Sequence, residues 1–83
     1  MITVLLPSTL RPARDNPLQV HEPVRTIEEL VQVLDRRIPG IKDQLDDAIF
    51  NFAVNDEMLL HGARDRTLTD GDVVEIVPAI SGG

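Results

Sequence analysis

The sequence contains no cysteine and only two histidines. Without cysteine there are no disulfide bonds, no thiolate metal sites and no cysteine nucleophile. His21 and His61 have no partner at metal-ligand spacing, so we expect both at the surface. The acidic turn Asp70-Gly71-Asp72 lacks the further oxygen ligands of a calcium loop. The sequence therefore predicts no metal site.

Basic residues are also scarce, with 8 Lys plus Arg against 14 Asp plus Glu. Nucleic-acid binding needs clustered cations that neutralise phosphates, and anionic membranes attract the same kind of cluster. The composition argues against both partners. An acidic domain favours a basic protein partner, although solubility alone accounts for the charge equally well.

Long apolar runs are absent. The first apolar stretch, Met1 to Leu6, ends at Pro7 and has no basic residue before it, so it predicts neither a signal peptide nor a membrane span. We expect a cytoplasmic protein. At 83 residues the chain has room for one domain and little space for an enclosed active site. Any chemistry is expected at the surface or at a terminus.

Hydrophobic periodicity predicts strands and one strong helix. Apolar residues recur at helical spacing from Ile27 to Ile38, and Thr26 and Glu29 have the spacing of a capping box. Alternating or β-branched stretches predict the strands. The expected order is a strand at 2–6, a strand at 18–22, a helix at 26–38, a short helical stretch at 41–49, and strands at 50–54, 58–60 and 73–77, with a loop at 61–66 and a turn at 69–72.

One amphipathic helix has one apolar stripe to bury, and a sheet has one face to cover. The first and last strands are the most apolar, so we expect them to be central, parallel neighbours. The prediction is an α+β fold, a four- to five-stranded mixed sheet with one helix packed across it. Residues 1–78 form this domain, and the small residues 79–83 form a flexible tail.

This order of elements resembles the ubiquitin-like β-grasp fold. The stretch from Asp70 to Gly83, DGDVVEIVPAISGG, with VNDE at 54–57 before it, is similar to the end of sulfur carriers of the MoaD/ThiS family. That family includes the small subunit of molybdopterin synthase, the thiamine-pathway carrier and the carrier that feeds a cysteine synthase. The pattern Pro-x-x-Leu-Arg-Pro at 7–12 is more similar to the cysteine-pathway carrier than to the molybdopterin-synthase subunit.

The resemblance implies a carrier for partner enzymes rather than an enzyme. The carboxylate of Gly83 would be adenylated by a ubiquitin-activating-type adenylyltransferase that uses ATP. A persulfide donor would then convert it to a thiocarboxylate. An acceptor enzyme, similar to cysteine synthase or to the large subunit of molybdopterin synthase, would take the sulfur. No cofactor is expected on the carrier itself.

The residues of the tail suit this task. Gly82 and Gly83 leave the reacting carbon without a side chain that would block a narrow tunnel, and glycine reaches backbone angles closed to other residues. Ala79, Ile80 and Ser81 complete a tail that spans at most about 17 Å when extended. We therefore expect the tail to enter the active site of a partner.

A docking surface is expected beside the tail. If Val54, Val74 and Ile76 face the helix, strand alternation turns their neighbours outward. Leu5, Ala53 and Val77 would then form an exposed apolar cluster of the kind that marks a partner surface.

Two alternatives remain open. In the first alternative, the chain is a protein modifier that is joined to target lysines through Gly83. Its single lysine, Lys42, would then offer one position for chains of itself. Otherwise it is a plain β-grasp interaction module whose tail has no function.

Overall fold

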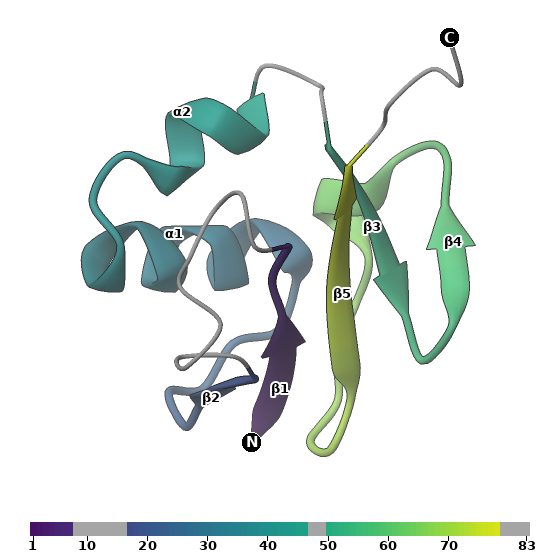
Figure 1. Cartoon of the computed structure of the whole chain (residues 1–83). Coiled ribbons are helices and arrows are strands. Elements are labelled where there is room, and N and C mark those ends of the chain that lie inside the picture. The colour runs from purple at the N-terminus through teal and green to yellow at the C-terminus, as the bar shows by residue number, and fades with distance from the viewer. Residues whose placement is uncertain (8–16, 47–49, 79–83) are drawn as a thin grey trace, which may run out of the picture.

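The computed structural model describes residues 1–7, 17–46 and 50–78 of the chain (Figure 1). Within these ranges the elements alternate between strands and helices. In chain order they are β1 (Ile2–Leu5), β2 (Leu18–Val20), α1 (Ile27–Arg37), α2 (Ile41–Asp46), β3 (Phe50–Val54), β4 (Glu57–Leu59), the 3-10 turn η2 (Ala63–Asp65) and β5 (Val73–Pro78).

The strands form one mixed sheet in the order β2-β1-β5-β3-β4. β1 runs parallel to β5, with Val4 opposite Val74, while β2, β3 and β4 pair with their neighbours antiparallel. Figure 1 shows β1 and β5 pointing the same way, with the N-terminus at the base of both. The predicted central, parallel pairing of the first and last strands is confirmed.

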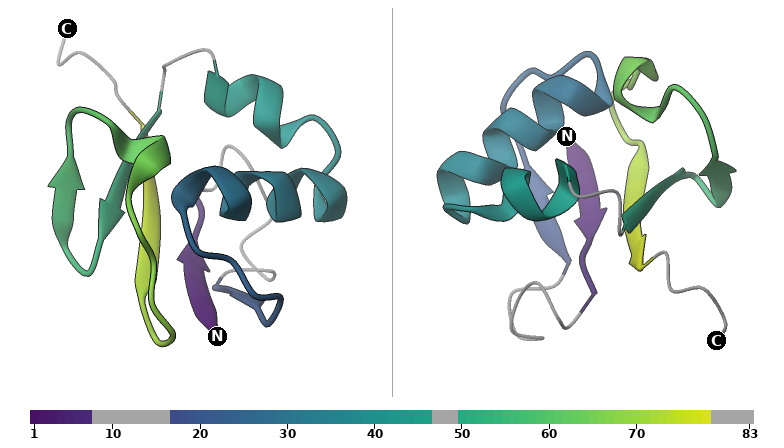
Figure 2. Two further views of the ribbon diagram at one scale, coloured as in Figure 1. Left: turned by 180° about the vertical axis from the view of Figure 1, so that it is seen from behind. Right: turned by 90° about the horizontal axis from the view of Figure 1, so that it is seen from above.

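The helix α1 covers one face of the sheet, and the core lies between them. Figure 2 shows both helices on one side of the strands, with α1 in front of β1 in the left view. Alternate residues of β1 and β5 point into this layer. The buried apolar cluster comprises Ile2, Val4, Leu6, Val20, Ile27, Leu30, Val31, Val33, Leu34, Ile41, Leu45, Phe52, Val54, Leu68, Val74 and Ile76.

The predicted start of α1 is confirmed, with one difference in its cap. The Glu29 N–H donates to the Thr26 hydroxyl at 3.2 Å, as the capping spacing predicts. The Glu29 carboxylate accepts from the Arg25 N–H at 2.9 Å, one residue before the cap. At the other end, the Asp35 carboxylate accepts from the N–H groups of Gly40 and Lys42. These bonds tie the end of α1 to the start of α2.

The predicted arrangement, an α+β β-grasp sheet with one helix across it, is therefore confirmed, and most differences concern boundaries. β2 ends at Val20 rather than residue 22, and β4 occupies 57–59 rather than 58–60. The expected loop at 61–66 contains η2, which begins after Gly62 at φ 65°. Left-handed backbone is open to glycine at little cost, and no periodic signal marks so short a turn.

The core predicts a clear contrast between two leucines. Leu34 is fully buried in α1, whereas Leu60 is 72% exposed. Leu34→Ala should lower the free energy of unfolding by about 2–5 kcal/mol, because it removes transfer free energy and leaves a cavity. Leu60→Ala should change it by less than about 0.5 kcal/mol. Urea denaturation followed by circular dichroism measures both values, and equal losses would contradict the assigned core.

Candidate functional site

The end of β5 positions the tail that the sequence singled out. Pro78, the last residue of β5, lies opposite Phe50 in the antiparallel ladder with β3, and Val77 lies opposite Asn51. β5 is flanked by strands on both sides, so the point from which the tail departs is held by the centre of the sheet. The tail residues Ala79, Ile80, Ser81, Gly82 and Gly83 lie outside the described residues. The segment Leu10-Arg11-Pro12 also lies outside them.

The start of β5 is held by two motifs that are distant in sequence. The Asn55 side chain accepts from the Val73 N–H at 2.9 Å and donates to the Asp72 carboxylate at 3.0 Å. Asp72 also accepts from the Thr69 N–H at 2.8 Å. Asn55 has φ 50°, a left-handed angle that asparagine tolerates better than most residues. The turn after β3 therefore locks the register of β5.

The pKa of Asp72 lies below its ordinary value of 3.8, mainly because the Thr69 N–H and then the Asn55 amide donate to the carboxylate. The predicted turn at 69–72 is thus confirmed, and Asp72 acts in it as a hydrogen-bond acceptor. The sequence did not predict that Asn55 anchors this turn, because its contacts with Asp72 and Val73 depend on the strand register.

The face of the sheet turned away from α1, here called the outer face, carries the predicted docking residues. Leu5 on β1 and Ala53 on β3 both lie opposite Glu75 on β5, and Met58 on β4 lies opposite Ala53. Val77 is two residues beyond Glu75 and so points to the same face. The register therefore brings Leu5, Ala53 and Val77 onto one face, as the alternation argument expected.

The expected exposure is wrong at one of these positions. Ala53 is only 5% exposed, because its small side chain lies between the longer side chains of Glu75 and Met58. Leu5 and Val77 are half-buried, whereas Met58 is 43% exposed. Strand alternation predicts which face a residue occupies, but it does not predict how far neighbouring side chains cover it. Met58 was missed because its alignment with Ala53 depends on the register of β4.

An ion-pair network joins η2 to both helices. The Arg64 guanidinium contacts the carboxylates of Glu28 at 2.7 Å and Asp46 at 2.5 Å, and it lies 5.9 Å from the centre of the Phe52 ring. Hydrogen bonds from Arg64 and Gln32 lower the pKa of Glu28. Asp46 is exposed at the surface, and its carboxylate is paired with both Arg64 and Lys42.

The single lysine belongs to the same network. The Lys42 ammonium lies 3.0 Å from Asp46, and the hydrogen bond to that carboxylate raises the pKa of Lys42 above its ordinary value of 10.5. The only lysine in the sequence is therefore engaged in an ion pair with Asp46.

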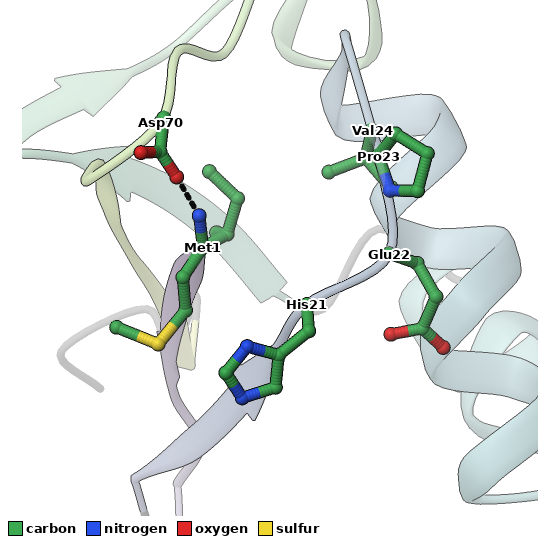
Figure 3. Close-up of a pocket in the computed structure, with 7 residues that line it drawn as sticks. Met1, His21, Glu22, Pro23, Val24 and Asp70 are labelled. Carbon is green, nitrogen blue, oxygen red and sulfur yellow. Dashed lines mark ion pairs between the residues drawn. The ribbon is translucent and has the colours of Figure 1, made fainter.

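A shallow pocket of about 220 Å³ lies at the end of the sheet where β1 and β5 begin (Figure 3). It is lined by Met1, His21, Glu22, Asp70 and three apolar residues, and the Met1 amine forms an ion pair with Asp70. Val73 and Pro78, the two ends of β5, are five residue steps apart, about 17 Å. The pocket therefore does not adjoin the point where the tail departs.

His21 and His61 are both exposed, as expected. Among residues 1–7, 17–46 and 50–78 there is no group of three or more His, Cys, Asp or Glu side chains that is suited to a metal ion. The helices in these ranges also include none that is long and apolar enough to cross a membrane.

Comparison with known proteins covers the whole chain. The ThiS family model matches residues 4–83. The sulfur carrier protein CysO of Mycobacterium tuberculosis is 31% identical over 91 residues, an alignment that covers 99% of this chain and 98% of the relative. CysO of Mycobacterium bovis matches with the same identity and coverage.

Three solved structures share the fold. The crystal structure of the Amycolatopsis orientalis BexX/CysO complex aligns with a TM-score of 0.79 at 30% identity, over 100% of both chains. Mycobacterium tuberculosis CysO aligns with a TM-score of 0.79 at 29% identity, over 96% of this chain and 100% of that one. The complex of subunits 1 and 2 of the molybdopterin-converting factor from Helicobacter pylori aligns with a TM-score of 0.63 at 22% identity, over 99% of this chain and 97% of that one. This similarity shows a shared fold alone.

The hydrogen bonds of Asp72 predict a specific dependence of stability on acid. Because its pKa is lower in the folded than in the unfolded state, its stabilising contribution is complete above about pH 4. The contribution is lost as the pH falls further, through the folded-state pKa. The asparagine of Asp72→Asn does not titrate. The difference in free energy of unfolding between wild type and variant should therefore shrink from about pH 5 to about pH 2. This range spans the ordinary aspartate pKa of 3.8. Urea denaturation across this range measures it, and a constant difference would contradict the assignment.

Proposed function

This chain belongs to the ThiS family of ubiquitin-like sulfur carriers, and on that premise we propose that it holds sulfur as a thiocarboxylate on Gly83. The observation that carries the proposal is the extent of the family match, which runs from residue 4 through the Gly82-Gly83 end. The full-length curated relatives are named as sulfur carrier proteins, and the chain is a carrier of the CysO type rather than an enzyme.

The chemistry begins with a carboxylate, which is a poor electrophile until it is activated. In the proposed sequence a Gly83 oxygen attacks the α-phosphorus of ATP on a ubiquitin-activating-type adenylyltransferase, and pyrophosphate leaves. The terminal sulfur of a donor persulfide then attacks the acyl carbon, and AMP leaves. A thiol breaks the resulting sulfur–sulfur bond, which releases the thiocarboxylate and a disulfide. The terminal sulfur is then a nucleophile for the acceptor.

The chain itself contributes position and access to this sequence. It has no cysteine that competes for the sulfur, so the sulfur has one place to reside. β5 is paired on both sides, with β1 and β3, so Pro78, the residue from which the tail continues, lies within the sheet. The outer face, with Leu5 and Val77 half-exposed, offers a surface for the partner that encloses the tail.

For the acceptor, we propose the enzyme of a cysteine pathway. The support is the likeness to CysO over the full chain and the Leu10-Arg11-Pro12 segment noted in the sequence. The chemistry is attack of the thiocarboxylate sulfur on the β-carbon of an activated serine-derived substrate, whose activated oxygen substituent leaves, with a pyridoxal-phosphate enzyme as catalyst. Hydrolysis of the adduct then returns the carboxylate of Gly83. Cytoplasmic location belongs to the same proposal, because such biosynthetic partners act there.

The loading step gives a direct test. Incubation with ATP, the activating enzyme and a persulfide donor should increase the mass of the chain by the replacement of one oxygen by sulfur. Fragmentation mass spectrometry should place the change in the C-terminal peptide, because no cysteine is present elsewhere. Deletion of Gly83 should abolish the gain, and so should one residue added after it, because the carboxylate then misses the adenylating centre.

The same variants separate the alternatives. Circular dichroism should show an unchanged fold for both, because the changes lie beyond β5. Sulfur on a chain that lacks Gly83, or none on the intact chain, would refute the proposal. A plain interaction module would tolerate loss of Gly82 and Gly83, and a protein modifier would appear as lysine conjugates on other proteins.

The acceptor has a test of its own. The thiocarboxylated chain, supplied to a cysteine-synthase-like enzyme with an activated serine substrate, should yield a cysteinyl adduct on Gly83, detected by intact-mass analysis. An unmodified Gly83 carboxylate serves as the control and should yield no adduct. Transfer of sulfur only to a pterin precursor would replace the cysteine pathway with the molybdopterin pathway.

A further inference from the structure

The outer face carries one carboxylate among apolar neighbours. Glu75 lies in the central strand β5, opposite Leu5 on one side and Ala53 on the other. Along its own strand, Val73 and Val77 precede and follow it on the same face. Glu75 is exposed, and its carboxylate forms no hydrogen bond or ion pair with any residue in the described part of the chain.

No cation of the described chain faces this carboxylate. Arg36, Arg37 and Lys42 belong to α1 and α2, and Arg64 belongs to η2. Arg25 and Arg66 hydrogen-bond through their backbones around the start of α1, on the helix side. Four of these side chains already pair with carboxylates: Arg37 with Glu22, Lys42 with Asp46, Arg64 with Glu28 and Asp46, and Arg66 with Glu57. The outer face is therefore anionic at its centre and is not neutralised from within the described residues.

Sheet stability does not account for glutamate at this position. Glutamate is depleted in strands, whereas valine, isoleucine and threonine are favoured, and the two flanking positions on the same face of β5 are valines. A third β-branched residue would suit the strand better. The carboxylate is therefore better explained by a contact outside the chain than by the fold.

We propose that Glu75 is the anionic anchor of a partner interface and that the enzyme that activates Gly83 presents an Arg or Lys side chain to it. The inference rests on the proposed function, because it needs an enzyme that docks on this face to reach the tail. Leu5, Val77 and Met58 would supply apolar contact around the ion pair. The partner surface is thus apolar with one central cation, complementary in charge to an acidic domain.

The physical reason is the cost of burying a lone charge. Docking on the apolar neighbours of Glu75 removes water from its carboxylate, and an unpaired carboxylate in an interface is strongly unfavourable. A partner with a matching cation restores the lost interaction, while a partner with an apolar or acidic group at that point is rejected. One side chain can therefore select among enzymes that handle similar glycine-ended tails.

The test uses the full chain, the purified activating enzyme of the same organism and ATP, and follows carrier-dependent exchange of labelled pyrophosphate into ATP. Glu75→Gln keeps the side-chain shape without the charge, and Glu75→Lys reverses the charge. Glu57→Gln is the control: Glu57 is also an exposed strand glutamate, but it forms an ion pair with Arg66 and lies opposite Val54, on the helix side.

The KM for the carrier should rise about tenfold for Glu75→Gln and about a hundredfold for Glu75→Lys, with kcat at saturation unchanged. The control should stay within about twofold of wild type, because an exposed ion pair contributes little. Added salt should raise the wild-type KM more steeply than that of Glu75→Gln, because screening weakens the proposed ion pair. Glu75→Thr keeps a good strand residue and should show the same rise in KM.

Each contrary result is distinct. If Glu75→Gln leaves KM unchanged while Gly83 of the wild type accepts sulfur, the anchor is refuted and the proposed function stands. If Val77→Asp raises KM but the Glu75 variants do not, the enzyme docks on the outer face without an ion pair to Glu75. The anchor is then refuted, and the proposed function stands. Self-association of Glu75→Gln by size-exclusion chromatography, with unchanged KM, would assign the carboxylate to solubility. If the wild type is not adenylated at all, the proposed function fails and this inference fails with it.

Discussion

Burial of the α1 stripe against one face of the sheet is the interaction on which the rest of this molecule depends. The fully buried side chains of Ile27, Leu30 and Leu34 meet alternate residues of β1 and β5, and no second helix layer exists among the described residues to cover the other face. A domain of this size has apolar surface for one core only. Among the described residues no helix covers the outer face, and this face and the end of β5 form the surface proposed for partner docking.

The central place of β5 connects the core to the proposed chemistry. Val74 and Ile76 are buried beneath α1, Glu75 and Val77 point to the outer face, and Pro78 ends the ladder beside Phe50. One strand thus holds the core, carries the residues proposed for docking and leads into the tail. Asn55 and Asp72 fix its start, so the position of its far end follows from the register. In the proposed function, the tail therefore follows directly from a strand at the centre of the sheet.

The electrostatics divide the molecule into two sides. On the helix side, several cations pair with carboxylates, as Arg64 does with Glu28 and Asp46. On the outer face, Glu75 has no internal partner among the described residues. Glu75 is thus one of the exposed carboxylates that contribute to the net charge of −6, and it lies where a partner is proposed to dock. A paired charge stabilises modestly, whereas an unpaired one is available for recognition.

Local patterns in the chain determined the element order, the start of α1 at Thr26, the parallel pairing of the first and last strands, and the family that the Gly82-Gly83 end resembles. These features depend on side-chain period, capping chemistry and turn residues, which are properties of neighbouring positions. Only the tertiary structure decided that Met58 lies opposite Ala53, that Ala53 is covered, that Arg64 joins two helices, and that Glu75 has no cation beside it among the described residues. Those facts arise from strand register and from contacts between residues far apart in the chain. Because a shift of register by one residue exchanges the two faces of a strand, no local pattern contains them.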